Sequence, residues 1–275
     1  MAPSLTLFFI VEPPNYDSYA CYLAASIREH LPGHIKLVGY CPAAKRDEVH
    51  PAVVETLTRM DCELRTFETV NRFDPAYPHG NKILACLEER ETDFAGFVDS
   101  DVIFIKDQDL SEYLHHDKVS CSPAVSMKWT DQSIWDQVYG ALDMSLPIER
   151  MALMRQKKQV HLPYYSSGIV YFSEIYRTGD GQRFPQVWMD TAQRIDAAPD
   201  IRRKRPYLDQ LSLAPAIRRA GLGWCPLPEE QNFALGGRMR GKPLPEDRDI
   251  AVVHYRYWAF LEEAGVKHKA YEMLQ

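Results

Sequence analysis

One stretch decides the fold: residues 94–105, which read Phe-Ala-Gly-Phe-Val-Asp-Ser-Asp-Val-Ile-Phe-Ile. Its first five residues are apolar and predict a short strand buried on both faces. Asp99 and Asp101 follow at once, and apolar residues resume at Val102. Two carboxylates this close at the end of a buried strand repel each other, and burial disfavours their charged forms. A divalent cation relieves both costs, since Mn²⁺ and Mg²⁺ prefer oxygen ligands. The alternative is a strand-end turn with solvated carboxylates, because a bare Asp-x-Asp fits either interpretation.

Upstream of this stretch, apolar segments alternate with segments of helical spacing. Strands are predicted at residues 5–11, 35–40 and 63–67, and helical patterns at 19–27, 49–60 and 81–90. This alternation predicts parallel strands with helical crossovers, an α/β fold with a Rossmann-like, mostly parallel central sheet flanked by helices. Ligands of such sheets bind beyond the carboxyl ends of the strands, where Asp99 and Asp101 are expected. No G-x-G-x-x-G follows the first strand, so the usual dinucleotide fingerprint is missing.

The second half of the chain is less regular. Strands are predicted at residues 164–172 and 251–253, and helices at 184–197 and 206–219. No repeat, low-complexity tract or linker-like stretch interrupts the sequence. We therefore predict a single domain over residues 1–275.

Bulk properties exclude several classes of protein. Hydrophobic residues make up 45% and charged residues 25%, which is ordinary globular composition. The 32 basic and 38 acidic residues give a net charge of −6, so we expect no nucleic-acid partner. The six cysteines are scattered without a C-x-x-C pair and indicate buried thiols in a reducing compartment. The apolar run at residues 5–11 is far shorter than the about 20 residues of a membrane span, so we expect a cytoplasmic protein.

The residues around the acid pair, Phe-Val-Asp-Ser-Asp-Val-Ile-Phe at 97–104, resemble the D-x-D segment of GT-A glycosyltransferases, in particular glycosyltransferase family 8. Further segments resemble that family in the same order along the chain. They are Asn15-Tyr16 before a helix with Ala24-Ala25-Ser26-Ile27, Asn81-Lys82, the strand at 165–170, Tyr207-Leu208-Asp209-Gln210, Asn232, and Val252-Val253-His254-Tyr255. The resemblance implies a GT-A fold and a metal-dependent hexosyltransferase. The expected donor is a nucleotide diphosphate sugar, namely a UDP-sugar. The sugar would pass with retention to a saccharide, lipid-linked or other hydroxyl acceptor.

The resemblance also implies residue roles. Asp99, Asp101 and His254 would hold Mn²⁺ or Mg²⁺, which acts as a Lewis acid on the leaving diphosphate. Asp209 and Gln210 would lie beside the transferred sugar, with Asp209 the sole candidate nucleophile. The residues expected to contact the nucleotide sugar are Val11, Asn15, Tyr16, Lys82, Asp99, Ser100, Ser167, Gly168, Asn232 and Arg256. The nucleotide-binding half would cover about residues 1–110, and the acceptor-binding, metal-completing half about 111–275.

Each of these side chains has an ordinary structural alternative. Lys82 fits a solvated lysine, and His254 fits a histidine satisfied within the fold. Asp209 fits an N-terminal cap for a helix over residues 210–219, and Asn232 fits a turn.

The chain also departs from the family. Pro13 and Pro14 replace acidic residues, and Ser166 replaces an Asn. The Gly and Lys expected after His254 are missing, although Arg256 is a candidate substitute because a guanidinium binds phosphate well. These departures favour a second hypothesis, a nucleotide-sugar-binding protein without turnover. A nucleotidyltransferase is disfavoured, since no Gly-rich basic loop follows the first strand.

Two further features leave alternatives open. Trp129, Trp135 and Tyr139 fit either core packing or an aromatic wall for an acceptor sugar. The basic run at residues 202–205 fits either a solvated loop or peripheral contact with an anionic membrane. Nothing in the sequence indicates an oligomeric state.

Overall fold

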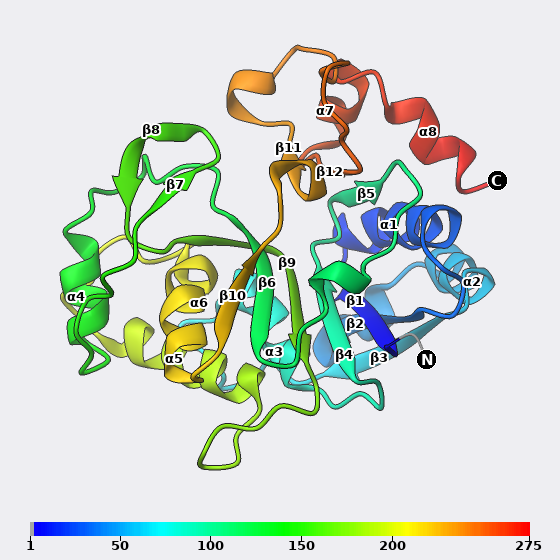
Figure 1. Ribbon diagram of the computed structural model, residues 1–275. Helices are drawn as coiled ribbons and strands as arrows, with labels where there is room; N and C mark the ends of the chain where they lie inside the picture. The colour runs from blue at the N-terminus through cyan, green and yellow to red at the C-terminus, as the bar shows by residue number, and fades with distance from the viewer. Residues whose placement is uncertain (1–2) are drawn as a thin grey trace.

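A sheet of seven strands forms the centre of the computed structural model, which describes residues 3–275 (Figure 1). In spatial order the strands are β10 (Gly223–Pro226), β6 (Lys118–Pro123), β9 (Tyr165–Ser173), β4 (Phe94–Val98), β1 (Leu5–Ile10), β2 (Lys36–Pro42) and β3 (Cys62–Phe67). Strand β9 runs antiparallel to its neighbours β4 and β6, and the other pairings are parallel. The predicted mostly parallel α/β sheet is confirmed.

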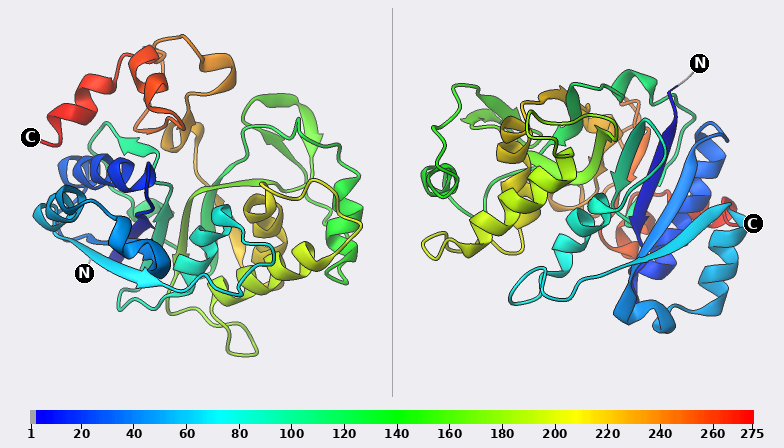
Figure 2. Two further views of the ribbon diagram at one scale, coloured as in Figure 1. Left: turned by 180° about the vertical axis from the view of Figure 1, so that it is seen from behind. Right: turned by 90° about the horizontal axis from the view of Figure 1, so that it is seen from below.

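Helices cover both faces of this sheet (Figure 2). Helices α1 (Tyr16–His30) and α2 (Pro51–Arg59) pack on one face, and α3 (Asn81–Leu87), α5 (Phe184–Ala197) and α6 (Leu208–Arg219) on the other. Strand β1 contributes to the hydrophobic cores on both faces of the sheet. Leu7 and Phe9 pack into the core beneath α1 and α2, whereas Phe8 packs into the core beneath α3, α5 and α6. Alternate side chains of a strand point to opposite faces, so a strand covered on both sides needs apolar residues at every position.

A second, smaller sheet places the C-terminal part of the chain next to the carboxyl end of β4. Its strands are β11 (Phe233–Ala234), β12 (Val252–His254) and β5 (Val102–Phe104). Helices α7 (Trp258–Glu263) and α8 (Lys267–Glu272) lie over it, and together they enclose a third core that includes Ile103 and Val253. Helix α4 (Ile134–Gly140) and the hairpin of β7 (Met151–Leu153) and β8 (Gln156–His161) lie on the opposite side of the molecule from α8 (Figure 1).

The structure decides several of the open alternatives. Helix α6 begins at Leu208, so Asp209 lies inside its first turn and the interpretation of Asp209 as a cap is wrong. Trp135 and Tyr139 are buried in the core, as packing requires. Trp129 is partly buried and stacks on Tyr207, with ring centroids 4.3 Å apart. Five of the six cysteines are buried, and none in the described part of the chain forms a disulfide.

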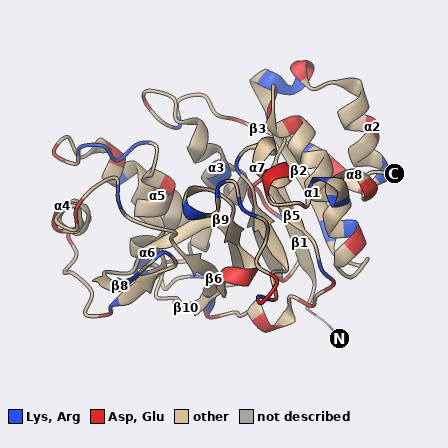
Figure 3. Ribbon diagram, turned by 90° about the horizontal axis from the view of Figure 1, so that it is seen from above, with Lys and Arg blue, Asp and Glu red and all other residues tan. Residues whose placement is uncertain are grey.

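Basic and acidic positions are interspersed along the ribbon in the view of Figure 3. Half of the basic run at 202–205 is used within the protein: Arg205 pairs with Asp196 at 2.5 Å, and Lys204 donates to the carbonyl of Ala198. Arg202 and Arg203 are exposed, and their contact with a membrane stays a prediction. Within residues 3–275, no helix has the length and apolarity needed to cross a membrane. The single-domain organisation and its division near residue 110 also stay predictions.

Candidate active site at the carboxyl end of the central sheet

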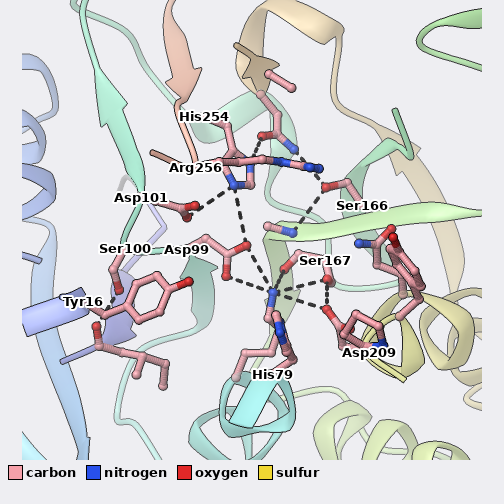
Figure 4. A pocket seen from close by; sticks show the side chains of 18 of the residues that line it. Tyr16, His79, Asp99, Ser100, Asp101, Ser166, Ser167, Asp209, His254 and Arg256 are labelled. Atoms are coloured by element: carbon pink, nitrogen blue, oxygen red, sulfur yellow. Dashed lines mark hydrogen bonds and ion pairs between the residues drawn. The ribbon is translucent and has the colours of Figure 1, made fainter. Parts of the chain in front are cut away.

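A cavity of about 480 Å³ opens beyond the carboxyl ends of β1 and β4. All but two of the residues predicted for the site line it (Figure 4). The exceptions are Val11, whose side chain is fully buried in the core, and Asn15, which is exposed at the start of α1. The motifs that are far apart in the sequence therefore meet at one site in the fold.

Asp99 and Asp101 occupy a tight turn between β4 and β5. The Asp99 N–H donates to the carbonyl of Gly168 at 2.7 Å, and the Val102 N–H donates to the carbonyl of Asp99 at 3.1 Å. His254 reaches this turn because β12 pairs antiparallel with β5, which places His254 opposite Val102. Its Nε2 lies 3.3 Å from Asp101 Oδ1 and 3.9 Å from Asp99 Oδ2. One ligand atom from each of the three side chains falls within 4.8 Å of the others.

Asn232 orients the His254 ring. Nδ1 of His254 lies 3.1 Å from Oδ1 of Asn232, and this ring nitrogen donates because an amide oxygen only accepts. The amide nitrogen of Asn232 donates in turn to Oγ of Ser122 and Oγ of Ser166. The hydrogen bond from His254 Nδ1 to Asn232 fixes the imidazole tautomer in which Nε2 carries no proton and can bind a metal. Asn232 is buried, so its interpretation as a simple turn residue is wrong.

Gly168 provides the room for this cluster. A Cβ built on Gly168 would lie 2.8 Å from His254 Cε1 and 3.0 Å from Asp99 Oδ2. Only a residue without a side chain fits at this point of β9.

Lys82 lies inside the site, and its interpretation as a solvated lysine is wrong. Its Nζ is 2.9 Å from Asp99 Oδ1, 3.3 Å from Asp209 Oδ2 and 3.3 Å from Ser167 Oγ. Burial alone would lower the pKa of Lys82, but the charges of Asp99 and Asp209 outweigh it and hold that pKa above its ordinary value. Lys82 is therefore a permanent cation that joins two carboxylates.

Asp209 has both carboxylate oxygens engaged. Tyr77 Oη donates to Oδ1 at 2.8 Å, and Oδ2 accepts from Ser167 Oγ and pairs with Lys82. The side chain is only 4% exposed. Gln210, by contrast, is half-buried and lines the cavity.

Ser100 and Tyr16 lie on the β1 side of the cavity, and Arg256 lines it as well. Ser100 lines the cavity, but its hydroxyl donates to the carbonyl of Ile10 at 2.5 Å, which pins the turn to the end of β1. Tyr16 lies at the rim, 45% exposed. Partial burial, reinforced by Asp101 and Asp99, raises the pKa of its phenol to about 12.

Sequence reasoning missed several lining residues. Glu12 follows β1 directly, accepts from Asn81 Nδ2 at 2.9 Å and pairs with Lys45 at 2.7 Å. Its place at a strand's carboxyl end was a usable signal. His79 also lines the cavity, but it lies in a short segment between β3 and α3 that shows no apolar periodicity. Tyr207, the first residue of the segment at 207–210, lines the cavity too.

The charge of the site favours a cation. Burial raises the pKa of Asp99, and the Asp101 charge adds to this effect while Lys82 opposes it. Burial acts on Asp101 in the same direction, but His254 outweighs it and holds the pKa of Asp101 below its ordinary value. Three carboxylates thus meet one ammonium, an excess of negative charge that a dication would balance.

A mostly parallel sheet with this cluster at the carboxyl end of β4 is the arrangement that the resemblance to GT-A glycosyltransferases predicts. The family described as Rhodobacterales glycosyltransferase domain matches residues 7–221, and the chain belongs to this family. It is therefore a transferase. The narrower resemblance to glycosyltransferase family 8 stays a prediction.

Solved glycosyltransferase structures share this fold at low sequence identity. The galactosyltransferase LgtC, in complex with donor and acceptor sugar analogs, is 17% identical with a TM-score of 0.57, over 98% of this chain and 95% of LgtC. Mouse xyloside xylosyltransferase 1 is 12% identical with a TM-score of 0.55, over 92% of this chain and 97% of the mouse protein. The bifunctional glycosyltransferase WbbM is 14% identical with a TM-score of 0.56 over 99% of this chain, which spans only 52% of WbbM. No curated protein matches the chain by sequence.

Proposed function

We propose that this glycosyltransferase is a metal-dependent hexosyltransferase that uses a nucleotide diphosphate sugar, a UDP-sugar in the first instance. The acceptor would be a hydroxyl of a saccharide or lipid-linked saccharide, and the anomeric configuration would be retained. The observation that carries the proposal is the convergence of Asp99, Asp101 and His254, with the imidazole Nε2 turned toward both acids.

The donor set fits Mn²⁺ or Mg²⁺. Two carboxylates and one imidazole are ligands that Mn²⁺ accepts, and the hydrogen bond to Asn232 presets the histidine. Because Gly168 has no side chain, His254 and Asp99 can approach each other next to it. When bound, the ion would supply Lewis-acid stabilisation of the diphosphate leaving group.

The remaining roles belong to the protein's own side chains. Gln210 is open to the cavity and would hydrogen-bond the transferred sugar. Asp209 would act as a positioning residue, because both its oxygens already hold Lys82, Ser167 and Tyr77 in place. To serve as the nucleophile it would first have to exchange one of these contacts for the sugar carbon. Arg256, at the rim, would contact donor phosphate.

A non-catalytic nucleotide-sugar-binding role is the second candidate. The engaged carboxylate of Asp209 and the missing Gly and Lys after His254 favour it. The two candidates differ in one measurement: only a transferase releases UDP or GDP from a donor when an acceptor is supplied.

A thermal-shift screen of UDP- and GDP-sugars with and without Mn²⁺ tests the proposal. A donor at about 100 times its Kd adds about 2.7 kcal/mol to the free energy of unfolding. We expect this shift to require Mn²⁺ and to disappear in Asp101→Ala. The matched control is Asp247→Ala, which removes an exposed acid outside the cavity and should leave the shift intact. A shift of equal size without metal would overturn the metal-dependent mechanism.

A further inference from the structure

A glycine-rich basic segment follows β11 and has no role in the site described so far. Residues 236–242, here the glycine loop, read Gly-Gly-Arg-Met-Arg-Gly-Lys. Gly237 and Gly241 have φ of 66° and 70°, a conformation that side chains rarely adopt. Loops of this composition let backbone N–H groups and cations approach an anion closely.

Arg155 fastens the glycine loop to the cavity wall. It lies at the turn between β7 and β8, and its guanidinium donates to the carbonyls of Ala234 and Gly236. Its own N–H donates to the carbonyl of Val125 at 3.0 Å, and both Val125 and Ala234 line the cavity. Figure 1 shows the segment after β11, in orange, between the β7–β8 hairpin and α7. The loop therefore starts at the wall of the cavity.

Four arginines gather around the start of the glycine loop, and two of them have no acidic partner among the described residues. Burial lowers the pKa of Arg155, and the nearby charges of Arg256, Arg238 and Arg248 lower it further, whereas Glu229 opposes them. Arg248 is neutralised by Glu229 and Glu230. Among the described residues, neither Arg238 nor Arg256 makes an ion pair. Like charges held together in this way favour an anionic ligand.

The charge of the cavity indicates which anion. Together, the Lys82 ammonium and a divalent cation would balance the carboxylates of Asp99, Asp101 and Asp209. Nothing is left to balance the diphosphate of a donor, whose negative charge grows as the sugar departs.

We propose that Arg238 and Arg256 form a phosphate clamp on the donor diphosphate, with the glycine loop, held in place by Arg155, as its support. This inference rests on the proposed function, since it assigns new residues to the same donor. Arg256 lines the cavity, and its Cδ lies 3.9 Å from the position of a Cβ built on Gly236, so the loop and Arg256 act as neighbours. Arg238 follows Gly237 in the same loop and is exposed, and a guanidinium can bind phosphate through two parallel hydrogen bonds.

Calorimetric titrations with UDP, UMP, GDP and GMP, each with Mn²⁺, test the clamp. The test quantity is the ratio of monophosphate to diphosphate Kd. We expect Arg238→Ala to weaken binding of the diphosphate about tenfold, the loss of one charge-assisted hydrogen bond, and to change monophosphate binding less than about twofold. Arg155→Met should lower the same ratio by releasing the loop.

Arg240→Ala is the matched control. It removes the same charge from the same loop, but its guanidinium lies 5.8 Å from the Phe260 ring centroid and is not among the neighbours that affect Arg155. An unchanged ratio in Arg238→Ala, or an equal loss in Arg240→Ala, overturns the clamp while the proposed function stands. A wild-type protein that binds none of the four nucleotides overturns both.

Discussion

Gly168 illustrates how much of this site depends on a single residue. It lies in β9 and carries no functional group, yet the space above it holds the His254 ring and the Asp99 carboxylate. A glycine in a strand interior often marks such a close approach.

Replacing Gly168 with alanine should separate the metal ligands. The new methyl group would lie 2.8 Å from His254 Cε1, so the ring must move away from the acids. We expect Mn²⁺ affinity, measured by calorimetry or by the EPR signal of free Mn²⁺, to fall at least about tenfold, together with an overpacking cost of about 1–3 kcal/mol.

Gly96→Ala provides the comparison. Its Cβ would meet Tyr171 and Leu7 at 2.5 and 2.6 Å, a comparable clash in the same sheet away from the acids. It should destabilise the fold without changing Mn²⁺ affinity. Equal affinity in the two variants would contradict the role given to Gly168.

At the scale of elements, a buried ion network joins α3, β9 and α5. Glu174 follows β9 and pairs with Arg90 at 2.6 Å and with Arg183 at 3.1 Å. The two guanidiniums also donate to the last carbonyls of α3, from Ala85, Cys86 and Leu87. Lys82 is on α3 and Ser167 on β9, so this network positions two elements of the site.

Glu174→Ala should destabilise the protein by about 3–5 kcal/mol, because it leaves buried guanidiniums without their carboxylate. Denaturant unfolding at neutral pH measures this loss. Glu230→Ala removes a partly exposed partner of Arg248 and should cost about 0–1 kcal/mol. A loss below about 1 kcal/mol for Glu174→Ala would show that the network is not structural.

The elements themselves were largely predictable. The predicted strands and helices of the first half all exist, because periodicity and burial agree there. The first residue of α6 was harder to predict from the sequence. Tyr207 occupies the N-cap position without a side-chain hydrogen bond, so no capping residue marks where the helix begins. The position of Glu12 directly after β1 could have been used, whereas no local pattern marks His79 as a residue of the cavity.

At the scale of the whole molecule, the metal cluster connects distant parts of the chain. Asp99 and Asp101 lie before β5, whereas His254 ends β12 in the C-terminal part. Helix α8 packs against α1, so this part also contacts the N-terminal part of the chain (Figure 2). A metal at this cluster would hold the two sheets together.

Bound Mn²⁺ should therefore protect the smaller sheet from hydrogen exchange. At about 100 times its Kd, we expect amides of β5 and β12 that open independently to exchange up to about 100-fold more slowly, with little change in α5. Exchange followed by mass spectrometry checks this, with Asp101→Ala as the variant that should lose the effect. Equal protection in Asp101→Ala would place the ion elsewhere.

The sequence by itself determined the parallel sheet, the acid pair at a strand's end and the set of polar residues to consider. These follow from local patterns, since strand burial and the spacing of apolar residues are written along the chain. Only the tertiary structure decided that Lys82 is buried between two carboxylates, that Asp209 is fully engaged and that Arg155 reaches the glycine loop. Such contacts depend on the pairing of β12 with β5 and on the packing of helices, and hydrogen bonds between residues far apart in the chain leave no local pattern.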